Sequence, residues 1–202
     1  MPKSHYDSRQ LDDLVLQMME TELGGEQVYR TALTRTIHPD LKKEWEGYLE
    51  ETLAHQNVVR GICDSLGLDP DAPSPTRAVV KHIGASLVQA MQLAKKSGTP
   101  EAAQMVACEC VVHAETKDHA NWELLGQVAK VATGDVGHTL KVAHKAVEKD
   151  EDHHLYHTKG WCRELAIQAL GMPAVLPPPE EIRNVETAIG ASRAEQQRTA
   201  ML

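Results

Sequence analysis

Carboxylate and imidazole side chains lie in the middle of the apolar face of four predicted helices. Burying an unpaired carboxylate costs several kcal/mol, so such groups persist in a core when they are paired or bind metal. Four carboxylates balance two divalent cations, and neutral imidazoles add nitrogen ligands of the kind that Fe(II) and Mn(II) accept. The candidate metal ligands are Glu22, Glu51, His55, Glu115, His119, Glu151 and His154.

The spacing of these residues places them in pairs on one helix face. Glu51 and His55 are four residues apart, and Glu151 and His154 are three apart. Each pair is therefore separated by about one helical turn. The three-residue spacing favours Glu151 as the ligand of the last long helix. When the chain is compared with itself at an offset of 99 residues, Glu51 aligns with Asp150, and His55 aligns with His154. This internal match favours Asp150 instead.

A second internal match indicates that one helix pair is a diverged copy of the other. Glu22 precedes Tyr29 by seven residues, and Glu115 precedes Trp122 by the same distance, at an offset of 93 residues. This two-fold pseudosymmetry predicts two similar half-sites that face each other. The two aromatic residues are interpreted as core side chains, with electron transfer beside the metals as the second reading. For His119, a hydrogen bond to a ligand is the alternative to metal binding.

Hydropathy with a period of three and four residues predicts five long helices and no strand. Pro39, Gly67, the DPDAPSP segment (69–75) and the proline-rich segment 171–179 interrupt the pattern. Short links join the helices within each pair, and a long connection with its own helix joins the two pairs. The pattern therefore predicts an all-α four-helix bundle with a long helical crossover between helices two and three. The predicted helices span residues 7–35, 40–66, 76–96, 100–133 and 136–170.

Residues 1–172 are predicted to form the bundle, and residues 173–202 a proline-rich tail. Ile182, Val185 and Ile189 have helical spacing, which predicts a short docking helix, with the last dozen residues loose.

Composition narrows the classes of partner. The 202 residues include 21 Lys and Arg against 29 Asp and Glu, a net charge of −8, with no basic run, so we expect no nucleic acid. No apolar stretch approaches the roughly 20 residues of a membrane span, and the N-terminal residues lack an apolar secretory core. The four cysteines form no C-x-x-C pair, which is typical of reduced thiols. These features predict a cytoplasmic protein that does not enter a membrane.

Several segments resemble ferritin-like proteins. The seven-residue spacing from Glu22 to Tyr29 resembles the first-helix signature of the rubrerythrin type, and the E-x-x-H of Glu151 and His154 is similar to the ferritin-like ligand pair. The segment LEETLAHQNVVRGICDSLG (49–67) looks like the bacterial stress-response proteins of the YciF type. The chain departs from bacterioferritin-like proteins in the four-residue spacing within helix two, and it has no ligands for a rubredoxin-type iron site.

The resemblance implies a ferritin-like di-iron carboxylate protein that holds two Fe or Mn ions and reacts with O2 or hydrogen peroxide, in oxidative stress or iron handling. Such a protein is an oxidoreductase of the peroxidase or ferroxidase kind. We also expect a homodimer formed through a bundle face or the C-terminal tail. Two alternatives stay open: a di-iron hydroxylase that acts on an organic substrate, and a non-catalytic helical stress or interaction protein with a degenerate metal site.

Overall fold

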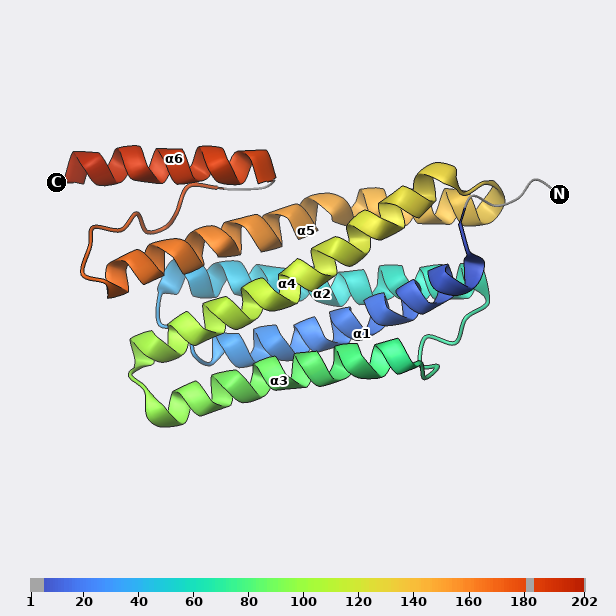
Figure 1. Cartoon of the computed structure of the whole chain (residues 1–202), viewed down its shortest axis with the longest axis horizontal. Coiled ribbons are helices and arrows are strands. Elements are labelled where there is room, and N and C mark those ends of the chain that lie inside the picture. Colours follow the sequence, from blue (N-terminus) through green and yellow to red (C-terminus); the bar gives the residue numbers. More distant parts are fainter. Residues whose placement is uncertain (1–5, 181–183, 202) are drawn as a thin grey trace.

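The computed structural model describes residues 6–180 and 184–201, which form six α-helices and no strand (Figure 1). The all-α prediction is therefore confirmed. The first five helices agree with the predicted ones to within two residues at each end. The helices are α1 (Ser8–Leu33), α2 (Pro39–Leu66), α3 (Pro75–Ser97), α4 (Pro100–Val131), α5 (Gly134–Ala169) and α6 (Asn184–Met201).

Local sequence explains where these helices begin and end. The side chains of Asp7, Ser74 and Thr99 cap the N-termini of α1, α3 and α4 by accepting a hydrogen bond from a backbone N–H of the first turn. Proline occupies the start of α2, α3 and α4, where its missing N–H costs nothing. Gly67 ends α2 in the left-handed conformation, at φ 67°, which a residue with a Cβ adopts only at a cost.

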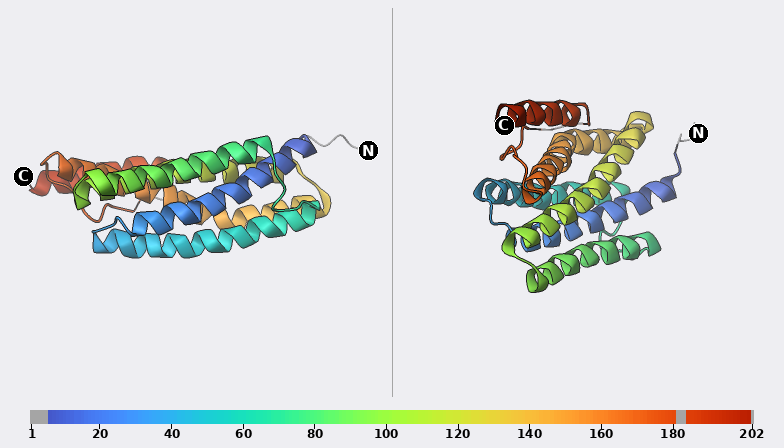
Figure 2. Two further views of the ribbon diagram at one scale, coloured as in Figure 1. Left: turned by 90° about the horizontal axis from the view of Figure 1, so that it is seen from below. Right: turned by 60° about the vertical axis from the view of Figure 1, so that its left-hand side comes forward.

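Four of the helices form a closed cycle of neighbours (Figures 1 and 2). α1 packs against α2 and α4, and α5 packs against the same two helices. α3 lies outside this cycle, against α1 and α4, and α6 contacts α5. The links between α1 and α2 and between α4 and α5 are short, so the helices of each pair run antiparallel (Figure 1).

The apolar core is divided into two clusters. On α1 the first cluster ends at Met19 and the second begins at Val28, and the other three helices of the cycle show a similar gap near the middle. On α4, for example, the gap runs from Val111 to Trp122. The middle of the cycle therefore holds a layer of side chains that belongs to neither apolar cluster.

The C-terminal tail differs from the predicted one. α6 continues to Met201 rather than forming a short helix with loose residues after it. The side-chain carboxylate of Glu164 on α5 accepts two hydrogen bonds from Nη2 of Arg198, at 2.9 and 3.0 Å, and one from the backbone N–H of Val175. These bonds connect α6, and the segment between α5 and α6, to α5. Of the residues predicted to dock, Ile182 lies outside the described residues, and so do the side chains of Val185 and Ile189.

Within the described residues, no helix combines the length and the apolar character that crossing a membrane requires.

Candidate metal centre

The layer between the two apolar clusters consists of carboxylates and histidines from all four helices of the cycle. No more than 5% of any of these residues is exposed. Helical spacing aims them inward, since each lies three or four residues from a buried neighbour on the same face. We call this set the polar layer; it contains Glu22 of α1, His55 of α2, Glu115 and Asp118 of α4, and Glu151 and His154 of α5.

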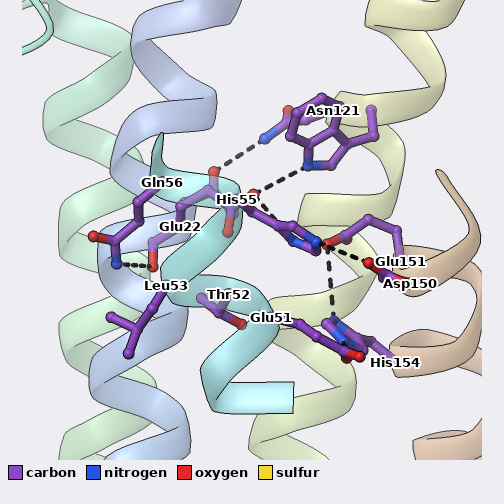
Figure 3. Close-up of polar contacts among 12 residues, drawn as sticks. Glu22, Glu51, Thr52, Leu53, His55, Gln56, Asn121, Asp150, Glu151 and His154 are labelled. Carbon is purple, nitrogen blue, oxygen red and sulfur yellow. Dashed lines mark hydrogen bonds and ion pairs between the residues drawn. The ribbon is translucent and has the colours of Figure 1, made fainter. Parts of the chain in front are cut away.

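One group of donor atoms joins α1, α2 and α5. Nδ1 of His55 lies 3.0 Å from Oε1 of Glu151 and 3.8 Å from Oε1 of Glu22 (Figure 3). One donor atom from each of these three residues lies within 4.8 Å of the other two. This arrangement has the dimensions of a three-ligand half-site.

A second group joins α4 and α5 and shares one residue with the first. Nδ1 of His154 lies 3.6 Å from Oε2 of Glu115 and 3.8 Å from Oε1 of Glu151. Donor atoms of these three residues also lie within 4.8 Å of one another. Because Glu151 belongs to both groups, its carboxylate lies where it could bridge two ions.

Two further carboxylates lie on the solvent side of the histidines. Oε2 of Glu51 is 2.7 Å from Nε2 of His154, and Oδ2 of Asp150 is 3.4 Å from Nε2 of His55 (Figure 3). The side chains of Glu51 and Asp150 are 44% and 37% exposed. Of the two alternatives for α5, the structure places Glu151 inside the polar layer and Asp150 outside it. The predicted ligand Glu51 touches His154 but belongs to neither donor group. We call Glu51 and Asp150 the outer carboxylates.

His119 does not join either donor group. Its Nε2 lies 2.8 Å from Oδ1 of Asp152, and its Nδ1 lies 3.9 Å from Oε2 of Glu123. Asp118, one residue earlier, faces the polar layer instead, because the buried stripe of α4 runs through positions 111, 115, 118, 122 and 125. Asp118 was not among the ligands predicted from the sequence. Its three-residue spacing from Glu115 was the available signal.

The two aromatic residues of the internal match lie in the core, one in each apolar cluster. Nε1 of Trp122 donates a 3.1 Å hydrogen bond to Oε1 of Glu22, which holds that carboxylate in place. The ring of Tyr29 packs edge-on against that of His154, with centroids 6.3 Å apart. Both aromatic residues therefore contact polar-layer residues directly.

Burial dominates the electrostatics of the polar layer. It raises the pKa of Glu22, Asp118 and Glu151 well above the usual range, and the like charges of the neighbouring carboxylates raise these pKa values further. Burial also lowers the pKa of His55. Burial alone would lower the pKa of His154, but the adjacent carboxylates of Glu115 and Glu51 raise it well above its usual value. The polar layer therefore holds several acidic groups close together, and the repulsion between their charges disfavours the ionisation of all of them at once.

Six buried donor or acceptor atoms of the polar layer have no hydrogen bond of good geometry among the described residues. An unsatisfied buried polar atom costs about 1–3 kcal/mol, and a cation would satisfy several of them at once. Carboxylate oxygen with imidazole nitrogen is a donor set that suits Fe(II), Mn(II) and related ions. The residues therefore fit a pair of divalent transition-metal ions. The six atoms are Glu22 Oε2, His55 Nδ1, Glu115 Oε2, Asp118 Oδ1, Glu151 Oε2 and His154 Nδ1.

In comparisons with known proteins, no family model, no curated protein and no solved structure matches the chain. The chemical interpretation of the site therefore depends on its own donor atoms and geometry.

Proposed function

We propose that this chain is a ferritin-like di-metal carboxylate protein. In this proposal α1, α2, α4 and α5 form a four-helix bundle, α3 is the helix of the crossover, and the polar layer binds two Fe or Mn ions. The closed cycle of contacts among the four helices and the position of α3 outside it support the bundle. Its role is the handling of iron or of oxidants during oxidative stress.

The observation that carries the proposal is the pair of buried donor groups that share Glu151. Glu22 and His55 complete one group, and Glu115 and His154 complete the other. A structural ion-pair network would satisfy its own hydrogen bonds, whereas these groups leave buried oxygen and nitrogen atoms with no hydrogen bond of good geometry among the described residues. Metal ions account for both the burial and the missing hydrogen bonds.

When bound, a pair of redox-active ions supplies electrons for the reduction of O2 or hydrogen peroxide. The residues of the chain bind the ions and orient the side chains that hold them. Trp122 fixes Glu22, and the apolar clusters on both sides of the polar layer exclude bulk water. Glu51 lines a surface hollow together with Glu44, Tyr48 and His153. Because Glu51 also contacts Nε2 of His154, it connects that buried imidazole to the protein surface.

Metal content is the first test of this proposal. Protein produced with iron or manganese in the medium should contain about two ions per chain by elemental analysis. The ferrous-loaded protein should consume O2 or hydrogen peroxide faster than the same amount of free Fe(II). The double variant Glu51→Ala, Glu115→Ala should lose that activity.

Two outcomes would contradict the proposal. Protein that takes up no metal under these conditions would be a helical scaffold rather than a metalloprotein. A double variant that reacts like the wild type would show that free iron, rather than the polar layer, produces the activity.

A further inference from the structure

We propose that Asp118 completes the half-site of Glu22, His55 and Glu151, and that the outer carboxylates, Glu51 and Asp150, orient the two histidines rather than bind metal. This inference rests on the proposed di-metal function. It assigns to the centre a carboxylate that the spacing argument did not include, and it gives Glu51 a different role.

The two halves of the polar layer are not equivalent. On α5, Glu151 lies three residues before His154, and both are buried. The residue three positions before His55 on α2 is Thr52, which is also buried. The Thr52 hydroxyl donates to the backbone carbonyl of Tyr48 at 2.8 Å, so its hydrogen bond is used within α2. α2 therefore has no buried carboxylate three residues before its histidine, whereas α5 has Glu151 at that position.

Asp118 of α4 supplies an additional buried carboxylate. It lies three residues after Glu115 on α4, whereas the residue three positions after Glu22 on α1 is Gly25. A Cβ at Gly25 would lie 3.5 Å from Cγ2 of Thr52, so α1 and α2 are in close contact here. Because glycine occupies this position, α1 offers no second carboxylate here, whereas α4 offers the buried Asp118.

The surroundings of Asp118 identify it as part of the centre. The residue is 5% exposed, and its Oδ1 has no hydrogen-bond partner among the described residues. Its charge acts on Glu22 and His55, and the charges of Glu151 and Glu115 act on it, so Asp118 lies within the polar layer. It belongs to neither three-residue donor group, and its role is that of an additional carboxylate beside them. With Asp118 included, the carboxylates of the polar layer are Glu22, Glu115, Asp118 and Glu151, whose four negative charges match two divalent cations.

The outer carboxylates have a different geometry. Each one contacts the histidine of the opposite helix at Nε2, with Glu51 of α2 at His154 and Asp150 of α5 at His55. Nδ1 of His55 then faces Glu151, and Nδ1 of His154 faces Glu115, and neither nitrogen makes a hydrogen bond of good geometry among the described residues. A metal-binding histidine commonly donates its other ring N–H to a carboxylate, which fixes the tautomer and the ring orientation. Glu51 and Asp150 fit this positioning role on both sides of the centre.

Stoichiometry of Mn(II) binding to the metal-free full-length chain tests the role of Asp118, with free Mn(II) followed by EPR. We expect two ions per chain for the wild type and one for Asp118→Asn. Glu164→Gln is the matched control, because it removes a buried carboxylate of α5 far from the polar layer along the helix, and it should keep two ions. Two ions bound by Asp118→Asn with wild-type affinity would overturn the inference. A wild type that binds no ion would instead refute the proposed function.

A pair of substitutions at Glu51 tests the positioning role. Glutamine keeps an oxygen that accepts from Nε2–H of His154, so Glu51→Gln should bind two Mn(II) ions with affinity within a few-fold of the wild type. Glu51→Ala removes the acceptor and should weaken binding about 10- to 100-fold. Loss of one ion in Glu51→Gln would make Glu51 a ligand and overturn the assignment. If Asp118→Asn does not fold, as judged by circular dichroism, a crystal structure of the Mn(II)-loaded wild type decides whether Asp118 lies at bonding distance from an ion.

Discussion

Trp122 and Glu22 are connected by a buried hydrogen bond, with Nε1 of the indole 3.1 Å from Oε1 of the carboxylate. The bond joins α4 to α1 inside the polar layer. Trp122→Phe removes the donor and leaves the carboxylate oxygen unsatisfied, which should lower the free energy of unfolding by about 2–4 kcal/mol, including the lost ring volume. Urea denaturation of the metal-free protein measures this change.

Trp45→Phe is the matched control for that experiment. Trp45 is as fully buried as Trp122, but its Nε1 has no hydrogen-bond partner among the described residues. Its replacement removes the same ring area together with an unsatisfied donor, so the cost should be smaller by about 1–2 kcal/mol. Equal destabilisation by the two substitutions would show that the bond to Glu22 contributes nothing.

The bond between Glu164 and Arg198 should hold α6 on α5. Arg198→Ala removes both contacts to the buried carboxylate, and a hydrogen bond to a charged group is worth about 1.5–3 kcal/mol, so amides of α6 should exchange with deuterium roughly 10-fold faster or more. Arg193→Ala changes an exposed arginine of the same helix and should leave the exchange rates unchanged. Equal exchange in the two variants would show that other contacts hold α6.

Acid should release the same contact. Burial favours the neutral form of Glu164, but hydrogen bonds from Val175, Arg163 and Arg198 outweigh it and keep the carboxyl pKa below its usual value. A lowered folded-state pKa contributes stability above the unfolded pKa, and this contribution disappears as pH falls through the folded pKa. The protection of α6 amides in the wild type, measured as deuterium exchange relative to that of the unfolded chain at the same pH, should therefore fall below about pH 4.5 and approach that of Arg198→Ala. Protection that stays at its neutral-pH value at pH 3 would contradict this mechanism.

The sequence predicts the all-α class and the bounds of the first five helices because strong local signals delimit the helices. Pro39, Gly67 and the loop at 69–75 stop or start a helix whatever surrounds them, and α1 to α5 end close to the predicted residues. The extent of α6 could not be predicted in this way. Its contact to α5 depends on a pair 34 residues apart, Glu164 and Arg198, and no spacing rule relates them.

For the candidate site, helical spacing brings most of the predicted ligands to one layer but cannot choose between neighbouring positions. From Glu115, both a three-residue and a four-residue step remain on one face of a helix, so the sequence alone does not decide between Asp118 and His119. Tertiary packing decides, because His119 contacts Asp152 of α5 while Asp118 faces inward. Exposure is likewise a tertiary property, and so the position of Glu51 outside the layer could not be predicted.

The ion pair between His157 and Glu44 should give a distinct pH dependence. Nδ1 of the imidazole lies 2.7 Å from Oε1 of the carboxylate, which also accepts hydrogen bonds from Tyr48 and Trp161. Burial opposes the charge on His157, but its contact with Glu44 outweighs burial and raises the imidazole pKa. A raised histidine pKa stabilises the fold fully below the unfolded pKa of about 6.5, and the contribution is lost as pH rises through the folded pKa.

His157→Gln removes the ionisable group and tests this dependence. The variant should be less stable than the wild type by about 1–3 kcal/mol at pH 5.5, and the difference should narrow as pH rises. His138→Gln, at an exposed position, should follow the wild type throughout. Urea denaturation at several pH values measures these differences in stability. A difference between His157→Gln and the wild type that widens as pH rises would rule out the charged pair.

The metal-free protein should lose stability as pH rises, since the polar layer holds several acidic groups together. Burial and like charges raise the pKa of Glu22, Asp118 and Glu151. The folded chain therefore binds protons more readily than the unfolded chain. Its stability is greatest below the unfolded carboxyl pKa and falls as pH rises from there through the raised folded values. Thermal melts of the metal-free chain between pH 4 and pH 8 measure this decline.

Metal should reverse the trend, because ions bind the deprotonated groups and only the folded state assembles the site. Mn(II) at 100 times its Kd adds about 2.7 kcal/mol per site, which raises Tm by roughly 5–10 °C for each occupied site at pH 7.5 and far less at pH 4.5. Glu115→Gln removes a charge that acts on Glu151 and Glu22, so it should stabilise the metal-free form or leave it unchanged while abolishing most of the metal effect. If this variant gains the full increase in Tm, the Glu115 carboxylate does not bind metal.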